Sequence, residues 1–425
     1  MAAVQHRCAE LDVIYTMKIA IISSSFFPVI DGVTVAVYYR LKRLRDLGHR
    51  VILFCPDYSV LKNIYPDWRD YTGEIMPGIK VINLPSTASI GLDFERDVTS
   101  KSYQIVVQRL AEFEPDIIHV DEAERLATRF LKIPGVEFAK QHKIPCVAFF
   151  HTNYIDYLDD YLTLPLGLNS IIKKILGLIF ANIYNSYNLT LIGSLITQQK
   201  LVTLGINNSR VGNFLGFDAN NYYNNFKQSN FFLEEYHLNL IQSKIKLIFI
   251  GRLTPDKGWD FTLKALTKLP LEIVDRIAII IAGDGDMCDR IEQTLKQLTP
   301  DVYLLGRIPP ESVSALLTNG DIFITNSEKE TKGLTVIEAA AAGLPAIAPR
   351  AGGVVDTIQD GVTGFLYQPQ QIEDFLEKLS LLIGDRNLRE SMGAKARESV
   401  QDYSWEQVVD NLIEVWMEQI DLINN

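Results

Sequence analysis

The stretch KLIFIGRLTPDKG, from Lys246 to Gly258, decides the fold that this sequence predicts. Its first half is a short apolar run, typical of a strand buried on both faces, and its second half is a turn rich in charge and glycine. A helical pattern follows as far as Leu269. A buried strand that leads through a polar turn into a helix is the repeating unit of a parallel α/β sheet.

The same alternation continues on both sides of this stretch. Further strands are expected at MKIAIISSSF from Met17, RVILFCP, KVINLP, DIIHV, PCVAFFH and NLTLIGS before it, and at RIAIIIAGDG, VYLLGRI, DIFITNS, PAIAPR and TGFLY after it. Helices are expected between them, among others at residues 34–47, 98–112, 310–318, 334–342, 372–384 and 387–400. The pattern predicts two α/β domains, each a parallel sheet covered on both faces.

The alternation pauses between residues 205 and 243, where asparagines crowd a polar, aromatic segment that we interpret as the interdomain connection. We therefore expect a first domain over residues 17–220 and a second over residues 221–404. A last helix, expected over residues 405–423, is apolar on one side and should pack back on the first domain. Ligands of such folds bind in the cleft at the carboxyl ends of the strands.

Composition narrows the class of protein. The 425 residues include 41 Lys and Arg against 52 Asp and Glu, a net charge of −11, and 47% are hydrophobic. A disordered chain is excluded, and an acidic chain without a long basic tract is not expected to bind nucleic acid.

Four widely spaced cysteines and no apolar signal in residues 1–16 favour a cytosolic location. Residues 1–16 are either a disordered extension or lie upstream of the true start. The uncharged run 175–199 is too rich in asparagine and glutamine to span a membrane.

The turn GRLTPDKG carries two cations at the end of a strand. Arg252 can bridge two phosphate oxygens with its planar fork, and Lys257 adds a mobile charge nearby, so together they can neutralise a pyrophosphate. The alternative is that both are surface residues. Asp31 and Gly32 follow the first strand in FFPVIDGVT, where a helix N-terminus can accept an anion, or where the glycine merely makes the turn.

The segment NSEKETKGLTVIEAAAAGLP places Glu330 in a loop and Glu338 in the helix that the loop enters. Both carboxylates can face one pocket and accept hydrogen bonds from sugar or ribose hydroxyls, and Gly333 between them exposes backbone N–H groups. The alternative is that Glu338 only neutralises neighbouring backbone.

Two histidines end predicted strands. His151 precedes a polar and aromatic cluster, Asn153, Tyr154, Asp156 and Tyr157, and is equally compatible with a reactive or a structural role. His119 is a second-rank candidate. Asp284-Gly285-Asp286 has the spacing of a metal-binding D-x-D, but a tight turn explains it better, and we expect no metal site.

The strings FFPVIDGVT, DIIHV, FFHTNY, GRLTPDKG, AGDG, the Glu330–Glu338 pair and GLPAIAPRAGGVVDTIQDGVTGFL resemble, in order and spacing, the retaining nucleotide-sugar glycosyltransferases of the GT-B fold. The resemblance covers nearly the whole chain from Met17. It implies two Rossmann-like parallel-sheet domains facing a central cleft, the second holding a nucleoside diphosphate sugar and the first an acceptor.

The resemblance also implies roles for individual residues. Arg252 and Lys257 match the residues that neutralise the diphosphate, Glu338 the ribose ligand, and Glu330 with the backbone at Gly333 and Leu334 the donor-sugar contact. Gly32 beside Asp31 matches the phosphate-facing loop, His151 the histidine near the anomeric carbon, and Arg307 with Ile308 the segment that pairs with the base. Thr331-Lys332 stand where many members have Gly-Phe.

The family is expected to work without a metal or other cofactor, because basic side chains and a helix N-terminus stabilise the leaving group. Retention is thought to follow front-side attack, with the departing phosphate taking the acceptor's proton. HTNYIDYL and the E-T-x-G form of the glutamate motif are most similar to plant and cyanobacterial digalactosyldiacylglycerol synthase and sulfoquinovosyltransferase. The resemblance thus implies a glycolipid acceptor and peripheral attachment to a membrane.

Two segments fit membrane attachment, because basic residues beside apolar ones suit an interfacial helix. They are YYRLKRLRDLGHR, with Arg40, Lys42, Arg43, Arg45 and Arg50, and LPLGLNSIIKKILGLIF around Lys173 and Lys174. We expect galactose transfer from UDP-galactose to a membrane galactolipid. The alternatives are sulfoquinovose transfer to diacylglycerol, hexose transfer to a soluble acceptor such as a sugar phosphate, and a catalytically inactive nucleotide-sugar-binding protein.

Overall fold

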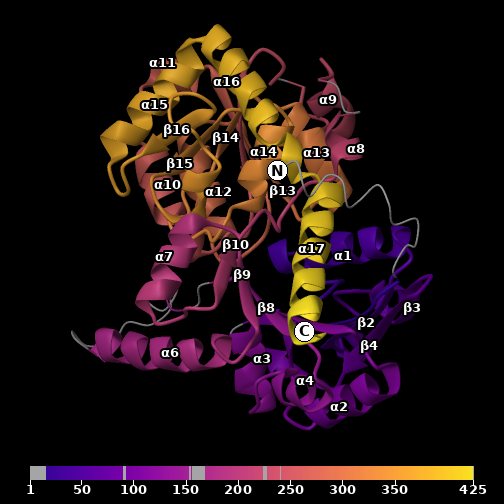
Figure 1. The fold of residues 1–425 in the computed structure, drawn as a ribbon. Helices are drawn as coiled ribbons and strands as arrows, with labels where there is room; N and C mark the ends of the chain where they lie inside the picture. The colour runs from indigo at the N-terminus through magenta and orange to yellow at the C-terminus, as the bar shows by residue number, and fades with distance from the viewer. Residues whose placement is uncertain are drawn as a thin grey trace, which may run out of the picture.

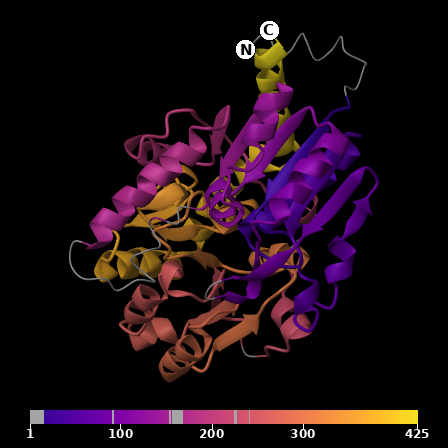
Figure 2. The same cartoon turned by 90° about the horizontal axis from the view of Figure 1, so that it is seen from below.

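The computed structural model describes residues 16–89, 92–152, 155, 168–223, 227–239 and 241–424. Residues 1–15 of the predicted extension at 1–16 lie outside these ranges, as does the polar cluster that follows Thr152. The described chain forms two α/β halves, the first indigo to magenta and the second orange, joined by a long yellow helix (Figure 1). Figure 2 gives the view from below.

The first half is built on an eight-stranded sheet. Its strand order is β10 (Ser209–Val211), β9 (Leu189–Ile192), β8 (Cys146–Phe150), β7 (Ile117–Asp121), β1 (Lys18–Ser23), β2 (Arg50–Pro56), β4 (Ile79–Leu84) and β3 (Gly73–Met76). All neighbours are parallel except β3 and β4. Ile19 and Ile21 of β1 enter the apolar cluster on one face, and Ala20 and Ile22 the cluster on the other, since side chains alternate along a strand.

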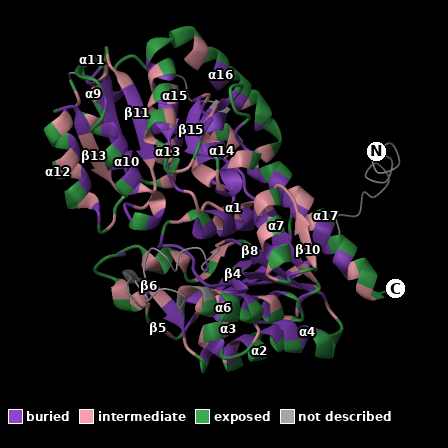
Figure 3. Cartoon of the chain, turned by 90° about the vertical axis from the view of Figure 1, so that its left-hand side faces the viewer, coloured by how far each residue is buried: buried purple, intermediate pink, exposed green. Residues whose placement is uncertain are grey.

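The second half repeats this plan with six parallel strands. Their order is β13 (Val302–Gly306), β12 (Ile277–Ala282), β11 (Ile245–Ile250), β14 (Ile322–Ile324), β15 (Ala346–Pro349) and β16 (Gly364–Tyr367). The covering helices include α10 (Trp259–Leu266), α12 (Cys288–Leu298), α13 (Pro310–Thr318), α14 (Leu334–Ala341), α15 (Ile372–Gly384) and α16 (Arg386–Ser399). Burial colouring shows both sheets as inner layers beneath helices with exposed outer faces (Figure 3). The predicted fold class is therefore confirmed.

The predicted helix over residues 98–112 is wrong at its start. Residues 92–98 form β6 (Leu92–Val98), which pairs with β5 (Ser86–Ser89), and helix α2 covers Ser102–Phe113. The segment LDFERDV places acidic residues at every second position, a period that suits a strand better than a helix. The antiparallel β3 was also missed, because its residues GEIM are too few to show a period.

The chain crosses between the halves twice at the same place. The N–H of Phe217 donates to the Tyr403 carbonyl over 2.9 Å, and the N–H of Trp405 donates back to the Phe217 carbonyl over 3.0 Å. A side chain at Gly216 would place its Cβ 2.4 Å from the Tyr403 carbonyl oxygen, so the two segments can approach this closely only with glycine there. The predicted domain boundary at residues 220 and 221 stays a prediction.

Helix α17 (Trp405–Asn424) returns from the second half and packs along α1 (Gly32–Asp46) of the first (Figures 1 and 2). Trp405 stacks on Tyr39 with ring centroids 5.4 Å apart, and Arg43 donates two hydrogen bonds to Asp410 over 2.9 and 2.7 Å. Trp416 is fully buried, and its Nε1–H donates to Nδ1 of His119 over 3.3 Å. The expectation that the last helix packs back on the first domain agrees with this packing.

We predict that Trp416→Ala lowers the free energy of unfolding by about 3–5 kcal/mol, because it empties a large core site and leaves His119 without its donor. Met417→Ala, next to it but 44% exposed, should change the free energy by less than about 0.5 kcal/mol. Urea unfolding of both variants, followed by circular dichroism, measures the difference. Equal effects of the two changes would contradict the packing of α17.

Candidate active site

A cavity of about 510 Å³ lies between the two halves and is lined by residues of both. Nine of the predicted site residues line it: Asp31, Gly32, Arg252, Lys257, Arg307, Ile308, Glu330, Leu334 and Glu338. They come from strand ends and helix starts in both halves, because the carboxyl ends of the parallel strands of each sheet point toward this cleft. Two predicted residues, His151 and Gly333, are not among its lining residues.

The turn after β11 carries two of the cations that line the cavity, Arg252 and Lys257. Lys257 ends the short 3-10 helix η3 (Pro255–Lys257), and Gly258 follows in the left-handed conformation with φ +75°. A Cβ on Gly258 would lie 2.1 Å from the carbonyl oxygen of Asn326, so only glycine allows the turn to pack this closely. The position of Lys257 in the cleft therefore depends on this glycine.

Both cations have acidic neighbours. Lys257 Nζ lies 2.6 Å from Glu330 Oε1, and Arg252 Nη2 lies 3.1 Å from Asp256 Oδ2. Glu330 and Lys257 are each about one-fifth exposed, so both remain accessible from the cleft. A phosphate that enters can therefore replace a carboxylate as the partner of a cation that is already in place.

The loop that carries Glu330 is held by a pair of glycines that the sequence reasoning missed as site residues. The N–H of Gly353 donates to the Glu330 carbonyl over 2.6 Å, and a Cβ there would lie 2.0 Å from the Thr331 carbonyl oxygen. Gly352 has φ +63°, and a Cβ there would lie 2.6 Å from the Glu330 carbonyl oxygen. The GG dipeptide was the only signal that could have identified them.

Glu338 faces the cavity from the second turn of α14. Within the described part of the chain, nothing hydrogen-bonds to its carboxylate, and burial raises the pKa of Glu338 to about 8. Such a carboxyl group gains most from a ligand that offers hydroxyl donors. Gly333 caps α14 with φ +82°, and Leu334, the first residue of the helix, lines the cavity.

On the first-half side, Asp31 is the N-cap of α1. Its Oδ1 accepts hydrogen bonds from the N–H groups of Val33 and Thr34, each over 2.8 Å, and Thr34 completes a capping box. These two N–H groups are therefore already satisfied and cannot serve the anion that the sequence predicts there. Gly32 is exposed beside them, with open space where a side chain would be.

Known protein families match both halves. Residues 30–212 match the family profile described as Glycosyltransferase Family 4, and residues 235–399 match Glycosyl transferases group 1. Both halves of the chain therefore match glycosyltransferase families, and the second half matches group 1.

Relatives and solved structures agree with this assignment. The chain is 29% identical to sulfoquinovosyl transferase SQD2 of Arabidopsis thaliana, over 86% of this chain and 66% of that protein, just under two-thirds of its length. It is 24% identical to alpha-monoglucosyldiacylglycerol synthase of Streptococcus pneumoniae, over 83% of this chain and 75% of that protein. Its fold matches the Anabaena protein HepE, solved in complex with UDP and glucose, with a TM-score of 0.70 at 19% identity, over 95% of this chain and all of that one.

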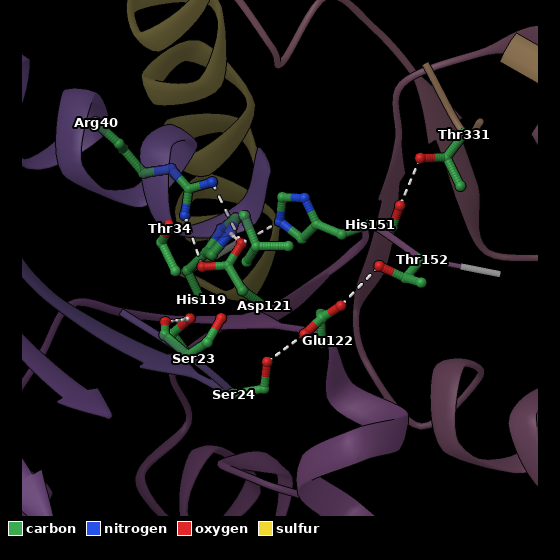
Figure 4. Close-up of polar contacts among 12 residues, drawn as sticks. Ser23, Ser24, Thr34, Arg40, His119, Asp121, Glu122, His151, Thr152 and Thr331 are labelled. Carbon is green, nitrogen blue, oxygen red and sulfur yellow. Dashed lines mark hydrogen bonds and ion pairs between the residues drawn. The ribbon is translucent and has the colours of Figure 1, made fainter. Parts of the chain in front are cut away.

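The two histidines predicted at strand ends, His119 and His151, are buried in the first half of this glycosyltransferase rather than exposed in the cleft (Figure 4). Asp121 accepts from Arg40 over 2.9 Å and lies 2.6 Å from His151 Nε2 and 3.2 Å from His119 Nε2. Burial alone would raise the pKa of Asp121, but Arg40 and the two histidines hold it well below its usual range. Burial, aided by Arg40, lowers the pKa of His119 to about 4.

His151 nevertheless contacts the donor side through its backbone. The Thr331 hydroxyl, one residue after Glu330, donates to the His151 carbonyl (Figure 4). Glu122 lies nearby and accepts from the hydroxyl groups of Ser24 and Thr152. The geometry therefore gives His151 a structural position beside the cleft, and its predicted role near the anomeric carbon stays a prediction.

The D-x-D sequence forms part of a turn. Asp284 accepts from the N–H of Gly285 over 2.8 Å and from Arg307 over 3.2 Å, so it is engaged in the turn and with a cation. Arg307 in turn hydrogen-bonds Tyr65, which belongs to the first half and was missed as a cleft residue. In the part of the chain that the structure describes, no three His, Cys, Asp or Glu side chains come together as metal ligands.

The basic residues of α1 could belong to an interfacial helix or to a packed one, and their contacts fit the packed helix. Arg40 is 2% exposed and paired with Asp121, Arg43 is paired with Asp410, and Lys42 lies over the ring of Tyr39. These cations satisfy charges of the first half and of α17 instead of facing a membrane. None of the helices in the described ranges combines the length and apolarity that crossing a bilayer requires.

We predict that Glu338→Gln stabilises the fold increasingly as pH rises from 5.5 to 8. The folded pKa of about 8 lies above the ordinary 4.5, so in this window the folded protein holds a proton that the unfolded chain has lost. Stability falls with rising pH where the folded state binds more protons. Glutamine removes this loss.

The melting temperature of the variant, measured by calorimetry from pH 5.5 to 8, should therefore rise increasingly above that of the wild type. The control is Glu377→Gln, on an exposed position of α15 outside the cavity lining. A constant difference between Glu338→Gln and the wild type would show that Glu338 is not buried as described.

Proposed function

We propose that this glycosyltransferase transfers galactose from UDP-galactose to a membrane galactolipid, with retention of configuration, to form digalactosyldiacylglycerol. The observation that carries the proposal is that Arg252, Lys257, Glu330 and Glu338 all line one cavity between the two sheets. Two cations for a diphosphate and two carboxylates for hydroxyl groups are what a nucleoside diphosphate sugar requires.

A second candidate is transfer of sulfoquinovose to diacylglycerol. The 29% identity to the Arabidopsis sulfoquinovosyl transferase favours it. The two candidates share the nucleotide, the cleft and a lipid acceptor, and they differ in the sugar and in the acceptor headgroup. Only the chemical identity of the product distinguishes the two candidate reactions.

In this proposal, the diphosphate of the donor replaces Glu330 as the partner of Lys257. A β-phosphate near Lys257 competes for the ammonium group with Glu330, whose carboxylate then becomes available to the sugar hydroxyls. The leaving diphosphate gains negative charge in the transition state, and fixed cations in a partly enclosed cleft stabilise that charge without reorganisation. This arrangement supports transfer that needs no metal ion.

A lipid acceptor is supported by helix α6 (Leu168–Tyr184). It leaves four apolar side chains exposed at helical spacing on one side, Ile171, Ile175, Leu178 and Ile179, beside exposed Lys174. An apolar helix face next to a cation suits attachment at the surface of an anionic membrane. The similarity to a synthase of monoglucosyldiacylglycerol points the same way. We therefore propose a peripheral membrane enzyme.

The test is incubation of the purified protein with UDP-galactose, UDP-glucose, UDP-sulfoquinovose and GDP-mannose. Liposomes carry monogalactosyldiacylglycerol or diacylglycerol, and products are identified by mass spectrometry. We expect digalactosyldiacylglycerol from UDP-galactose, at an unchanged rate in the presence of EDTA. A sulfoquinovosyl product alone would establish the second candidate, and loss of the reaction with EDTA would overturn the metal-free mechanism.

We predict that Lys257→Ala lowers kcat by about 10²–10³-fold, the usual effect of removing one donor that stabilises developing negative charge. The matched control is Lys264→Ala, on an exposed position of α10 outside the cavity lining, which should keep full activity. Both variants should have the wild-type melting temperature within about 2–4 °C, because partly exposed ion pairs contribute little to stability. Full activity of Lys257→Ala would contradict the assignment of the cleft.

A further inference from the structure

The cavity has two walls of opposite character. Every Lys and Arg among its lining residues belongs to the second half, namely Arg252, Lys257 and Arg307. The described lining that precedes the crossing at Phe217 contains three acidic residues, Asp31, Asp67 and Glu95, and no Lys, Arg or His. A second anion bound on the first-half wall would therefore face like charges.

Glu95 is the most enclosed of these three acids. It lies on β6, its side chain is 9% exposed, and Arg125 donates to its Oε2 over 2.6 Å. Within the described ranges no group hydrogen-bonds to its Oε1, and the residue lines the cavity. Burial is the main factor that raises the pKa of Glu95. Among the like charges, that of Asp31 raises it most. A neutral hydroxyl donor relieves both costs, whereas an anion adds to them.

Asp97, two residues along the same strand, binds the same arginine without reaching the cavity. Its Oδ1 accepts a hydrogen bond from Arg125 Nε over 3.0 Å, and its Oδ2 forms an ion pair with Arg129 Nη2 at 2.6 Å. Arg125 is thus held by two carboxylates of β6. Its positive charge pairs with these carboxylates rather than with a ligand in the cleft.

The edge of this wall is apolar. Ile30 and Ile64 line the cavity and are 51% and 49% exposed, and Val60 nearby is 63% exposed. The same segment also exposes Lys62 and Arg69, which do not line the cavity. Exposed apolar side chains at the edge of a binding cavity indicate a ligand with an apolar part. We call Ile30, Val60 and Ile64 the apolar edge.

We propose that the acceptor is the hydroxyl group of an uncharged lipid headgroup, which Glu95 binds through Oε1 while the apolar edge contacts the glycerol and acyl portion. The proposal rests on the function proposed above and deepens it, because it assigns the residues that bind the acceptor and exclude charged headgroups. Glu95 is a specificity residue for the acceptor, and Asp31 and Asp67 reject anionic headgroups by repulsion.

The test supplies UDP-galactose with three acceptors. Phosphatidylcholine liposomes contain either monogalactosyldiacylglycerol or phosphatidylglycerol, and glucose 6-phosphate is offered in solution. We expect transfer to the galactolipid only. Transfer to phosphatidylglycerol at a comparable rate would overturn this inference and leave transfer to lipid intact. Transfer to glucose 6-phosphate alone would overturn the proposed lipid acceptor as well.

Glu95→Gln and Asp97→Asn form the matched pair of variants. Glu95→Gln should lower kcat/KM for the galactolipid by about tenfold or more, because a hydrogen bond to a charged group is lost. The dissociation constant for UDP should be unchanged, which reports an intact donor site. Asp97→Asn loosens the same arginine but should keep the acceptor kinetics. Equal losses in both variants would mean that Glu95 only anchors Arg125, and the inference would be wrong.

Discussion

Lys257 and Glu330 meet in the cleft at 2.6 Å, and the remaining parts of the donor site are arranged around this contact. Both side chains are about one-fifth exposed, so a ligand in the cleft can reach the pair. The ion pair acts by holding both side chains in position. The lysine is held where a diphosphate would bind, and the glutamate is held where it can be exchanged for that diphosphate.

This contact depends on backbone approaches that only glycine permits. Gly258 lets the Lys257 turn pack against Asn326, and Gly353 lets the Glu330 loop pack against the segment after β15. The two loops follow different strands of one parallel sheet, β11 and β14, which are neighbours in the sheet. Their carboxyl ends lie at the same edge, so residues 73 positions apart in the sequence become partners. The ion pair is therefore a consequence of the topology.

The second half could be predicted almost residue by residue, and the first half less well. Helices α13 and α15 have the predicted bounds, because buried parallel strands and their covering helices have strong local periods. The hairpin of β5 and β6 was missed because β5 has only four residues and the two strands pair only with each other. It carries Glu95, so the acceptor wall could not be placed from the sequence. The cations at the strand end in GRLTPDKG could be placed, because strand ends of parallel sheets meet at the cleft.

Burial of the charged residues could not be read from the sequence either. Arg40 looks like a surface cation in a basic helix, and only the sheet order places it beside Asp121 at the end of β7. His151 and His119 share the same carboxylate for the same reason, since β7 and β8 are adjacent. A residue on a strand end can face the cleft or the helix layer, and the strand order with its packed helices decides which.

The departure at Thr331-Lys332 from the Gly-Phe of many relatives gains a physical interpretation from these contacts. Neither residue lines the cavity. Thr331 donates to the His151 carbonyl and accepts from the Thr197 hydroxyl over 3.1 Å through its own carbonyl, and both partners lie in the first half. Lys332 Nζ lies 3.4 Å from the Tyr403 hydroxyl, next to the place where the chain crosses between the halves. Thr331 and Lys332 therefore make polar contacts between the halves directly behind Glu330 and outside the cavity lining.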